Sequence, residues 1–372
     1  MTRSELAGAD GHIRAIRWYP YQIPFLQSFA TAHGPLTRRD GAIVEIITEE
    51  GYTGIGEIAP LPEFSGASLA NALSVLPAYA NQFQGRTLST ALLKLEEDTC
   101  LPPTLQSGLE LALFDALGQQ AGKSLANMLN AGQSKTTVSV NAVVGARKLA
   151  EAVQQAHKAV EQGFPCIKLK MVGEENEQIA RVAAVRESIG SAIHLRLDAN
   201  EGWSLEQGRR ILKACERFQI QYVEHPLPAI DIAGMRALQN ETTIPLAADE
   251  AVNSLTGARK LLEAHAASVL SLKPQLIGGL RNTRKIILEA KQLNVACVIT
   301  SSIETGIGLA GALHLAAASP EITLPCGLAT LELLADDLLT NALNIRHGEI
   351  AVPEAPGLGV TLDRAALARY GQ

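Results

Sequence analysis

The sequence of 372 residues predicts an α/β fold in which a parallel (β/α) barrel is joined to a smaller α+β part. The first observation is that short apolar strands alternate with amphipathic helical stretches between about residues 136 and 328, at a pitch of roughly 25 residues that is typical of repeated βα units. The second is that eight such strands, without the Gly-rich fingerprint of dinucleotide-binding sheets, favour a closed barrel over an open sheet. The strands are expected at 137–143, 166–171, 194–199, 221–225, 245–249, 268–273, 296–301 and 323–327.

The chain before and after the barrel has a different pattern. Residues 42–60 alternate like two strands around a turn at Glu50–Gly51. Residues 104–129 place apolar side chains at helical spacing, and Gly122 predicts the end of one helix within this stretch. Residues 349–360 combine strand and turn residues, so we expect this tail to return to the N-terminal part. These features predict an α+β part beside the barrel.

Composition narrows the class of function. Hydrophobic residues make up 47% of the chain and the formal net charge is −6, which predicts a globular protein with a sizeable core. A nucleic-acid partner is not expected, because basic clusters are missing apart from Arg38–Arg39. A membrane partner is not expected either, since no run reaches about 18 apolar residues. The N-terminus lacks the apolar region of a signal peptide, which favours a cytoplasmic location.

The cysteines agree with that location. They are scattered, odd in number and without a CxxC pair, so a disulfide framework or a zinc site is not expected. The five residues are Cys100, Cys166, Cys215, Cys297 and Cys326. The stretch GIGLAG (306–311) is not expected to bind a dinucleotide. It resembles the dinucleotide-binding fingerprint only loosely, because it lies late in the chain and no acidic partner follows it.

Charged residues recur at the same place on five successive barrel strands. In each strand, alternation turns the apolar set towards the helices and the charged set towards the barrel interior. Neighbouring strands carry these charges one βα unit apart, near their C-terminal ends, where barrels of this kind hold their chemistry. The residues are Lys168, Lys170, Asp198, Glu224, Asp249 and Lys273.

The joint pattern predicts a metal-assisted acid–base site. Three inward carboxylates repel one another in a low dielectric, and hard oxygen ligands without Cys or His favour Mg²⁺ over zinc, with Mn²⁺ as a substitute. Lys168, Lys170 and Lys273 are expected to lower one another's pKa, which prepares a general base. Taken singly, each residue is more typical of a solvated face or a turn. His225 follows Glu224, but alternation turns it away, so a supporting role is expected.

At these residues the sequence resembles the enolase superfamily, in its muconate-lactonizing subgroup. The motifs that carry the resemblance are KLK (168–170), LDANEGW (197–203), VEHP (223–226), ADEA (248–251) and LKPQLIGGL (272–280). The resemblance covers nearly the whole chain. It implies a modified TIM-type barrel over residues 131–328, and an α+β capping domain formed by residues 1–130 and completed by about 329–372.

The resemblance also implies a role for each residue of the site. The residues implied to bind Mg²⁺ are Asp198, Glu224 and Asp249. When a proton α to a substrate carboxylate is removed, the metal would stabilise the enediolate that forms. Lys170 would be the acid and base on one face of the substrate, and Lys273 would stand on the opposite face. Lys168 would help to lower the pKa of Lys170.

Two further stretches indicate which reaction is expected. Residues 301–316 (SSIETGIGLAGALHLA) and 325–339 (PCGLATLELLADDLL) resemble o-succinylbenzoate synthases. Dipeptide epimerases of the subgroup usually carry an Asp-x-Asp pair after the last strand, whereas this chain has Gly-Leu-Ala-Thr at 327–330. The resemblance therefore implies a Mg²⁺-dependent dehydration of 2-succinyl-6-hydroxy-2,4-cyclohexadiene-1-carboxylate to o-succinylbenzoate, a step of menaquinone or phylloquinone biosynthesis.

The expected partner is thus a small-molecule carboxylate. The residues expected to contact it are Asn200, Ser301, Ser302, Gly306 and Gly327, the two glycines through backbone N–H groups near them. For the two serines, ordinary hydrogen bonding at a strand end is an equal alternative. Residues 29–41 and 60–66 are rich in turn residues, and we expect them to cover the barrel mouth.

Other functions stay open at this point. A dipeptide epimerase or N-acylamino acid racemase would exchange protons through Lys170 and Lys273, one on each face of the substrate. A non-catalytic barrel would keep a metal and bind a ligand without turnover, although the intact lysines disfavour it. A Schiff-base aldolase would leave the three carboxylates without a purpose. An oligomer is compatible with the sequence.

Overall fold

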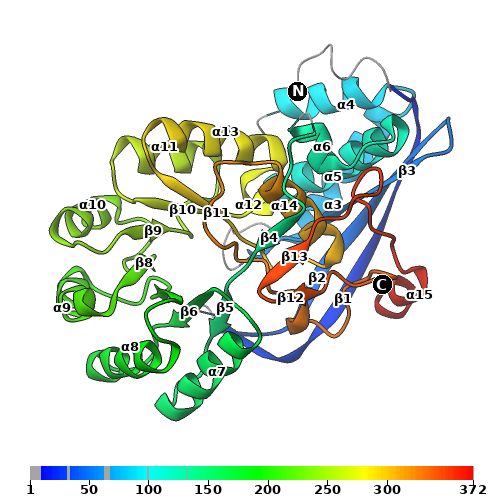
Figure 1. Ribbon diagram of the computed structural model, residues 1–372. Coiled ribbons are helices and arrows are strands. Elements are labelled where there is room, and N and C mark those ends of the chain that lie inside the picture. Colours follow the sequence, from blue (N-terminus) through cyan, green and yellow to red (C-terminus); the bar gives the residue numbers. More distant parts are fainter. Residues whose placement is uncertain (1–9, 32–33, 63–67, 99, 131, 372) are drawn as a thin grey trace.

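The computed structural model describes residues 10–31, 34–62, 68–98, 100–130 and 132–371. Its centre is a sheet of seven strands, in which each strand pairs in parallel with the next along the chain (Figure 1). The strands are β5 (Ala142–Val144), β6 (Cys166–Lys170), β7 (His194–Asp198), β8 (Ile220–Glu224), β9 (Leu246–Ala248), β10 (Val269–Leu272) and β11 (Ala296–Ile299). This sheet confirms the predicted α/β barrel class.

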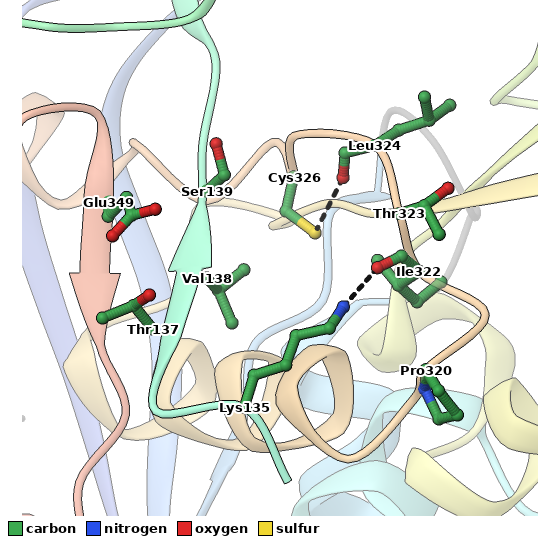
Figure 2. A pocket seen from close by; sticks show the side chains of 10 residues that line it. All are labelled: Lys135, Thr137, Val138, Ser139, Pro320, Ile322, Thr323, Leu324, Cys326 and Glu349. Atoms are coloured by element: carbon green, nitrogen blue, oxygen red, sulfur yellow. Dashed lines mark hydrogen bonds between the residues drawn. The ribbon is translucent and has the colours of Figure 1, made fainter.

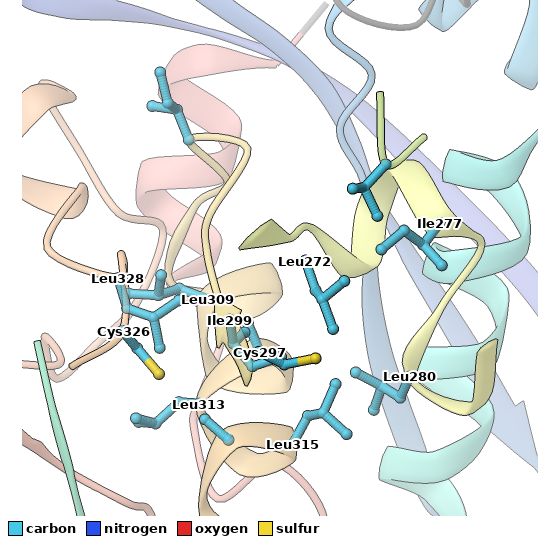
Figure 3. Close-up of a cluster of buried hydrophobic side chains, with 14 of the residues drawn as sticks. Leu272, Ile277, Leu280, Cys297, Ile299, Leu309, Leu313, Leu315, Cys326 and Leu328 are labelled. Atoms are coloured by element: carbon cyan, nitrogen blue, oxygen red, sulfur yellow. The ribbon is translucent and has the colours of Figure 1, made fainter. Parts of the chain in front are cut away.

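Helices follow the strands and cover the outside of the curled sheet (Figure 1). They are α7 (Leu149–Glu161), α8 (Glu175–Ile189), α9 (Leu205–Cys215), α10 (Ile232–Glu241), α11 (Leu255–Glu263), α13 (Leu280–Gln292) and α14 (Gly306–Ala317), with the short α12 (Pro274–Ile277) and the 3₁₀ turn η1 (Glu216–Phe218) between them. Most of their buried side chains are apolar, although α8 also buries Gln178 and Arg181. Figure 3 shows part of the core, with Leu272 and Ile299 of the sheet beside Leu280 of α13 and Leu313 of α14.

The two edges of the seven-stranded sheet approach each other at residues 326–327. Cys326 forms a parallel bridge with Val140, and Gly327 forms one with Thr300. The segment therefore occupies the closing position of the barrel. The prediction of a regular eighth strand over 323–327 is wrong, because only these single bridges form among the described residues.

The first predicted strand, 137–143, is divided between two sheets. Its beginning, β4 (Thr137–Ser139), pairs antiparallel with β13 (Glu349–Ala351) near the C-terminus, and β13 pairs with β12 (Ile345–Arg346). Its end becomes β5 of the barrel. The prediction of one continuous strand is therefore wrong, because a partner from the far end of the chain captures the first half.

The N-terminal part is an antiparallel sheet covered by helices. The sheet has the order β1 (Ile13–Thr31), β2 (Gly34–Thr48) and β3 (Thr53–Ile58). The turn between β2 and β3 lies at Glu50–Gly51, where Gly51 has φ +92°, as the alternation predicts. The helices are α3 (Leu69–Phe83), α4 (Leu88–Glu97), α5 (Pro103–Ala121) and α6 (Leu125–Leu129). Gly122 ends α5 in the left-handed conformation, as predicted.

The tail returns to the N-terminal part, as its composition predicts. After the 3₁₀ turn η2 (Leu331–Leu333) and the β12–β13 hairpin, Gly357 forms a bridge with Ser124, between α5 and α6. The chain then ends in α15 (Arg364–Tyr370), which lies near β1 (Figure 1). All five cysteines are free. Among the described residues, no helix is long and apolar enough to cross a membrane.

Candidate active site

Three of the charged residues lie side by side at the C-terminal ends of neighbouring strands. The register pairs Lys170 of β6 with Asp198 of β7, and Asp198 with Glu224 of β8. Arg196 and Tyr222 lie two positions before Asp198 and Glu224, and therefore on the same faces of β7 and β8. The guanidinium of Arg196 lies 4.6 Å from the ring centroid of Tyr222. Tyr222 belongs to a small apolar cluster separate from the main core, as expected for the barrel interior. The charged residues above it therefore face inwards, as predicted.

Lysines and carboxylates form a continuous set of ion pairs. The Nζ of Lys168 lies 2.9 Å from Oδ2 of Asp198 and 2.6 Å from Oε1 of Glu224. The Nζ of Lys170 lies 2.7 Å from the same Asp198 oxygen and 2.7 Å from Oδ1 of Asn200. Both carboxylates are buried, so these charges interact through a dielectric lower than that of water.

A second ion pair lies on the neighbouring strands. Lys273 directly follows β10, and its ammonium group donates to the carboxylate of Asp249, which follows β9. The backbone N–H groups of Asp249 and Glu250 donate to Nδ1 of the buried His225, at 2.8 and 2.9 Å. His225 thus supports the turn that carries Asp249, in agreement with the role expected for it.

The ion pairs change the expected titration of the lysines. Burial lowers the pKa of Lys168, but the carboxylates of Asp198 and Glu224 outweigh it and hold that pKa well above its ordinary value. Burial also lowers the pKa of Lys273, but the carboxylate of Asp249 raises it. The pKa of Lys273 is therefore raised above its ordinary value as well. The prediction that the lysines lower one another's pKa is wrong for these two side chains, because each ammonium group faces carboxylates.

The carboxylates fit a divalent cation in their chemistry. Asp198, Glu224 and Asp249 offer hard oxygens, and Oε2 of Glu224 is buried without a hydrogen-bond partner in the described part of the chain. A buried carboxylate oxygen is costly to leave unpaired, so it marks a place for a cation or a donor. No three His, Cys, Asp or Glu side chains among the described residues form a ready metal cluster. Instead, Lys168 stands between two of the carboxylates.

The residues predicted to contact substrate do not all converge. Asn200 joins the ion-pair cluster through Lys170. The backbone N–H groups of Gly306 and Gly327 donate to backbone carbonyls at 2.8 and 2.9 Å. The N–H groups of the two glycines themselves are therefore committed within the fold, and the expectation that N–H groups near them receive a substrate carboxylate stays a prediction.

The two serines after β11 differ from each other. The hydroxyl of Ser301 donates to the buried carboxylate of Glu304 and accepts from Oγ1 of Thr330 at 2.9 Å. This agrees with the alternative of ordinary strand-end hydrogen bonding. The hydroxyl of Ser302 is buried and has no hydrogen-bond partner among the described residues.

Two charged residues near this loop were not predicted. Arg39 of β2 and Glu57 of β3 are buried and bond to the loop between β11 and α14. Their partners lie 264 and 248 positions later in the chain, so no local pattern indicates the contact. Part of the segments expected to cover the mouth, residues 32–33 and 63–66, lies outside the described residues.

Two cavities of the described structure lie elsewhere. One of about 370 Å³ is lined by β4 and the segment 320–326, and in Figure 2 the Lys135 side chain points across it to the carbonyl of Ile322. A second of about 440 Å³ is lined mainly by residues 328–345. Neither lining includes a lysine or carboxylate of the ion-pair cluster. We therefore place the candidate site by its charged side chains.

Comparison with known families agrees with this geometry. A family model described as "Enolase C-terminal domain-like" matches residues 151–366, which is more than half of the chain, and a model described as "MenC, N-terminal domain" matches residues 13–116. The chain therefore belongs to the enolase superfamily.

Particular relatives within that superfamily differ in activity. The hydrophobic dipeptide epimerase of Enterococcus faecalis is 29% identical over 94% of this chain and 98% of its own length. The o-succinylbenzoate synthase of Listeria innocua is 28% identical over 94% of this chain and 93% of its own. The crystal structure of the dipeptide epimerase from Enterococcus faecalis, complexed with Mg and the dipeptide L-Leu-L-Tyr, has a TM-score of 0.88 at 28% identity. The match covers 94% of this chain and 99% of that chain.

Proposed function

We propose that the protein is a Mg²⁺-dependent lyase that converts 2-succinyl-6-hydroxy-2,4-cyclohexadiene-1-carboxylate to o-succinylbenzoate. The observation that carries the proposal is the segment at 327–330, which closes the barrel next to β11. This segment offers the hydroxyl of Thr330 where dipeptide epimerases usually carry a pair of carboxylates. A substrate with carboxylates and a ketone, and without an ammonium group, suits it better. The similarity to the Listeria innocua o-succinylbenzoate synthase is compatible with this reaction.

The ion-pair cluster supplies the groups for this reaction. Asp198, Glu224 and Asp249 would hold Mg²⁺, or Mn²⁺ in its place, whose charge offsets the negative charge that develops on the substrate carboxylate. Nζ of Lys170 takes the proton α to that carboxylate. The same ammonium group then gives a proton to the departing hydroxyl, which leaves as water. Lys273 stands on the other face of the ring as a fixed cation. One proton and one hydroxide are lost, so the ring becomes aromatic.

The shared oxygen of Asp198 links the two functions of the cluster. A base must be neutral to accept a proton, whereas Lys170 is held beside Oδ2 of Asp198 as an ion pair. The same oxygen belongs to a carboxylate that would hold Mg²⁺, so the proposed base lies in direct contact with a proposed metal ligand.

The proposal is tested by comparing substrates on the same purified protein. Loss of the diene's ultraviolet absorbance measures dehydration, and NMR in D₂O measures deuterium incorporation at the α-carbon of dipeptides and N-acylamino acids. The proposal predicts that kcat/KM for dehydration exceeds that for any exchange reaction. Faster exchange with a dipeptide or an N-acylamino acid, and slow dehydration, would overturn it.

Epimerisation or racemisation is the second candidate. Its support is that the Enterococcus faecalis epimerase is as similar to this chain as the synthase is. Lys170 and Lys273 also pair with carboxylates on different strands, as two bases on opposite faces would. Tight Mg²⁺ binding with no proton exchange on any carboxylate tested would instead favour a non-catalytic barrel.

A further inference from the structure

Arg39 connects the N-terminal sheet to the barrel mouth through backbone carbonyls. It lies on β2 with an exposed fraction of only 2%. Nε donates to the carbonyl of Ile303 at 2.9 Å, and Nη2 donates to the carbonyl of Ser302 at 3.3 Å. Nη1 and Nη2 also donate to the carbonyls of Pro60 and Ala59. The planar guanidinium has five N–H donors and can hold several acceptors at once, which a lysine ammonium cannot reproduce in this geometry.

Glu57 holds the other end of the same loop. It lies on β3 and is fully buried. Oε1 accepts from the Tyr21 hydroxyl and from the N–H of Thr305 at 2.9 Å, and Oε2 accepts from the Thr305 hydroxyl at 2.7 Å and the N–H of Gly308 at 2.8 Å. The protein's own carboxylate thus occupies the N-terminus of α14, where a negative charge is favoured.

The loop between these two anchors is strained. Ile303 has φ +59°, a left-handed conformation that is an outlier for a β-branched residue. Such a conformation persists only where the surroundings hold it. The N–H of Ile303 donates to the Ser301 hydroxyl at 2.8 Å, and its carbonyl accepts from Arg39. Next to it lies Ser302, whose buried hydroxyl has no hydrogen-bond partner in the part of the chain that the structure describes.

We propose that Arg39 and Glu57 are positioning residues that hold the loop 302–305 as a preformed wall of the barrel mouth. The inference rests on the proposed function for its substrate, because the wall would contact the polar part of the cyclohexadiene carboxylate. The lysines and carboxylates of the site lie on β6 to β8 and directly after β9 and β10, away from this loop in sequence. Loosening the loop therefore weakens binding and leaves proton transfer largely intact.

Two substitutions with matched controls test the proposal. Arg39→Lys keeps the charge and loses the fork of donors. Glu57→Gln keeps the shape and turns an amide N–H group towards the donors of the loop. The control for the first is Arg38→Lys, on an exposed side chain next to it. The control for the second is Glu45→Gln, a buried carboxylate that also accepts from a tyrosine hydroxyl but contacts α15.

Steady-state kinetics with the cyclohexadiene substrate give the first readout. Both test variants should raise KM by about tenfold or more and change kcat by less than about threefold, whereas both controls should stay within about twofold of the wild type. Unchanged KM in either test variant, with its fold intact by circular dichroism and thermal unfolding, would overturn the proposal. If one test variant does not fold, the other carries the test.

Amide hydrogen exchange gives a second readout that needs no turnover. Exchange at residues 302–305 should become about tenfold faster or more in the test variants, and the barrel strands should keep wild-type rates. A uniform increase over the whole chain would show a merely structural role and contradict the proposal. If the wild type does not dehydrate the substrate but the loop exchanges as expected, the proposed function fails and the role in positioning the loop stands.

Discussion

Oδ2 of Asp198 is the acceptor shared by two ammonium groups, those of Lys168 and Lys170. The two lysines and the two carboxylates of Asp198 and Glu224 therefore balance one another within a buried space. Charges of this kind are retained only when each has a partner. At the residue scale, the proposed function makes these ion pairs exchangeable, because a bound metal would compete with the lysines for the same carboxylate oxygens.

Replacing Lys170 tests its role as the base. Lys170→Ala should lower kcat for dehydration by about 10²- to 10⁴-fold, because a positioned general acid or base contributes about that much. The absorbance assay measures it. The matched control is Lys158→Ala, on an exposed position of α7, which should keep wild-type turnover. Normal dehydration by Lys170→Ala would remove this residue from the reaction.

The sequence predicted the type and the inward face of these residues but not their partners. Alternation along β6 to β8 is a local property, so the positions of Lys170, Asp198 and Glu224 follow from it. The ion-pair partner of each residue depends on how far its side chain reaches across the barrel. A single sequence does not indicate that distance. Arg39 and Glu57 were missed for the same reason, since their bonds join residues about 250 positions apart.

At the scale of elements, β3 packs closely on α5 through two glycines. A Cβ atom at Gly56 would lie 2.0 Å from the carbonyl oxygen of Gly108, and one at Gly54 would lie 2.1 Å from that of Ala112. These contacts are with backbone, which cannot move aside without shifting the helix. The pair therefore sets the distance between the N-terminal sheet and its central helix.

Substitution at Gly56 tests this packing. Gly56→Ala should lower the free energy of unfolding by about 1–3 kcal/mol or more, as overpacking does in other cores. Urea denaturation followed by circular dichroism measures it. Gly145→Ala is the control, because a Cβ there meets no heavy atom within 4 Å. Equal stability of the two variants would contradict the close approach.

His314 of α14 links α6 to the C-terminal segment and gives the fold a pH dependence. Its Nδ1 accepts from the N–H of Ala126 in α6, and Nε2 donates to the carbonyl of Leu358. Burial lowers its pKa from 6.5 to about 4. The folded state therefore keeps a neutral ring at a pH where the unfolded chain binds a proton, so the stability from this residue is present above pH 6.5 and falls as the pH drops towards 4.

The measurement compares His314→Gln with the wild type at two pH values. The stability advantage of the wild type should shrink by about 2 kcal/mol between about pH 7.5 and pH 5. Burial raises the pKa of Asp115 to about 6, so its contribution to stability changes with pH in the opposite direction. Because Asp115 is present in both proteins, its contribution cancels in the difference between the wild type and His314→Gln. His157→Gln, on an exposed histidine, should show no such change. A pH-independent difference for His314→Gln would contradict the neutral ring.

Elements with local signals were predicted well, and those with distant partners were not. The turn at Glu50–Gly51 and the helix end at Gly122 follow from residue type, and both are confirmed. The strand 137–143 was predicted as one piece because its hydrophobic pattern is continuous. The structure divides it because β13, more than 200 positions later, pairs with β4.

At the scale of the whole molecule, buried carboxylates fasten the N-terminal part to the barrel. Glu110 of α5 accepts from the guanidinium of Arg281 and from the N–H of Leu280, where α13 begins. Glu57 of β3 likewise accepts from the N–H of Gly308, in the first turn of α14. The division into a cap of residues 1–130 and 329–372 over a barrel of 131–328 remains a proposal. These contacts support the view that such a cap shapes the barrel mouth.

The most direct test of the central claim is dehydration of the cyclohexadiene carboxylate by the full chain, measured after EDTA treatment and again after Mg²⁺ is added back. The proposed function predicts no turnover with EDTA and full recovery with Mg²⁺, and Lys170→Ala with Mg²⁺ should recover only the about 10²- to 10⁴-fold lower kcat expected for it. Turnover that is unaffected by EDTA would contradict the metal-assisted reaction. No dehydration with Mg²⁺, together with α-proton exchange on a dipeptide, would assign the chain to the epimerases instead.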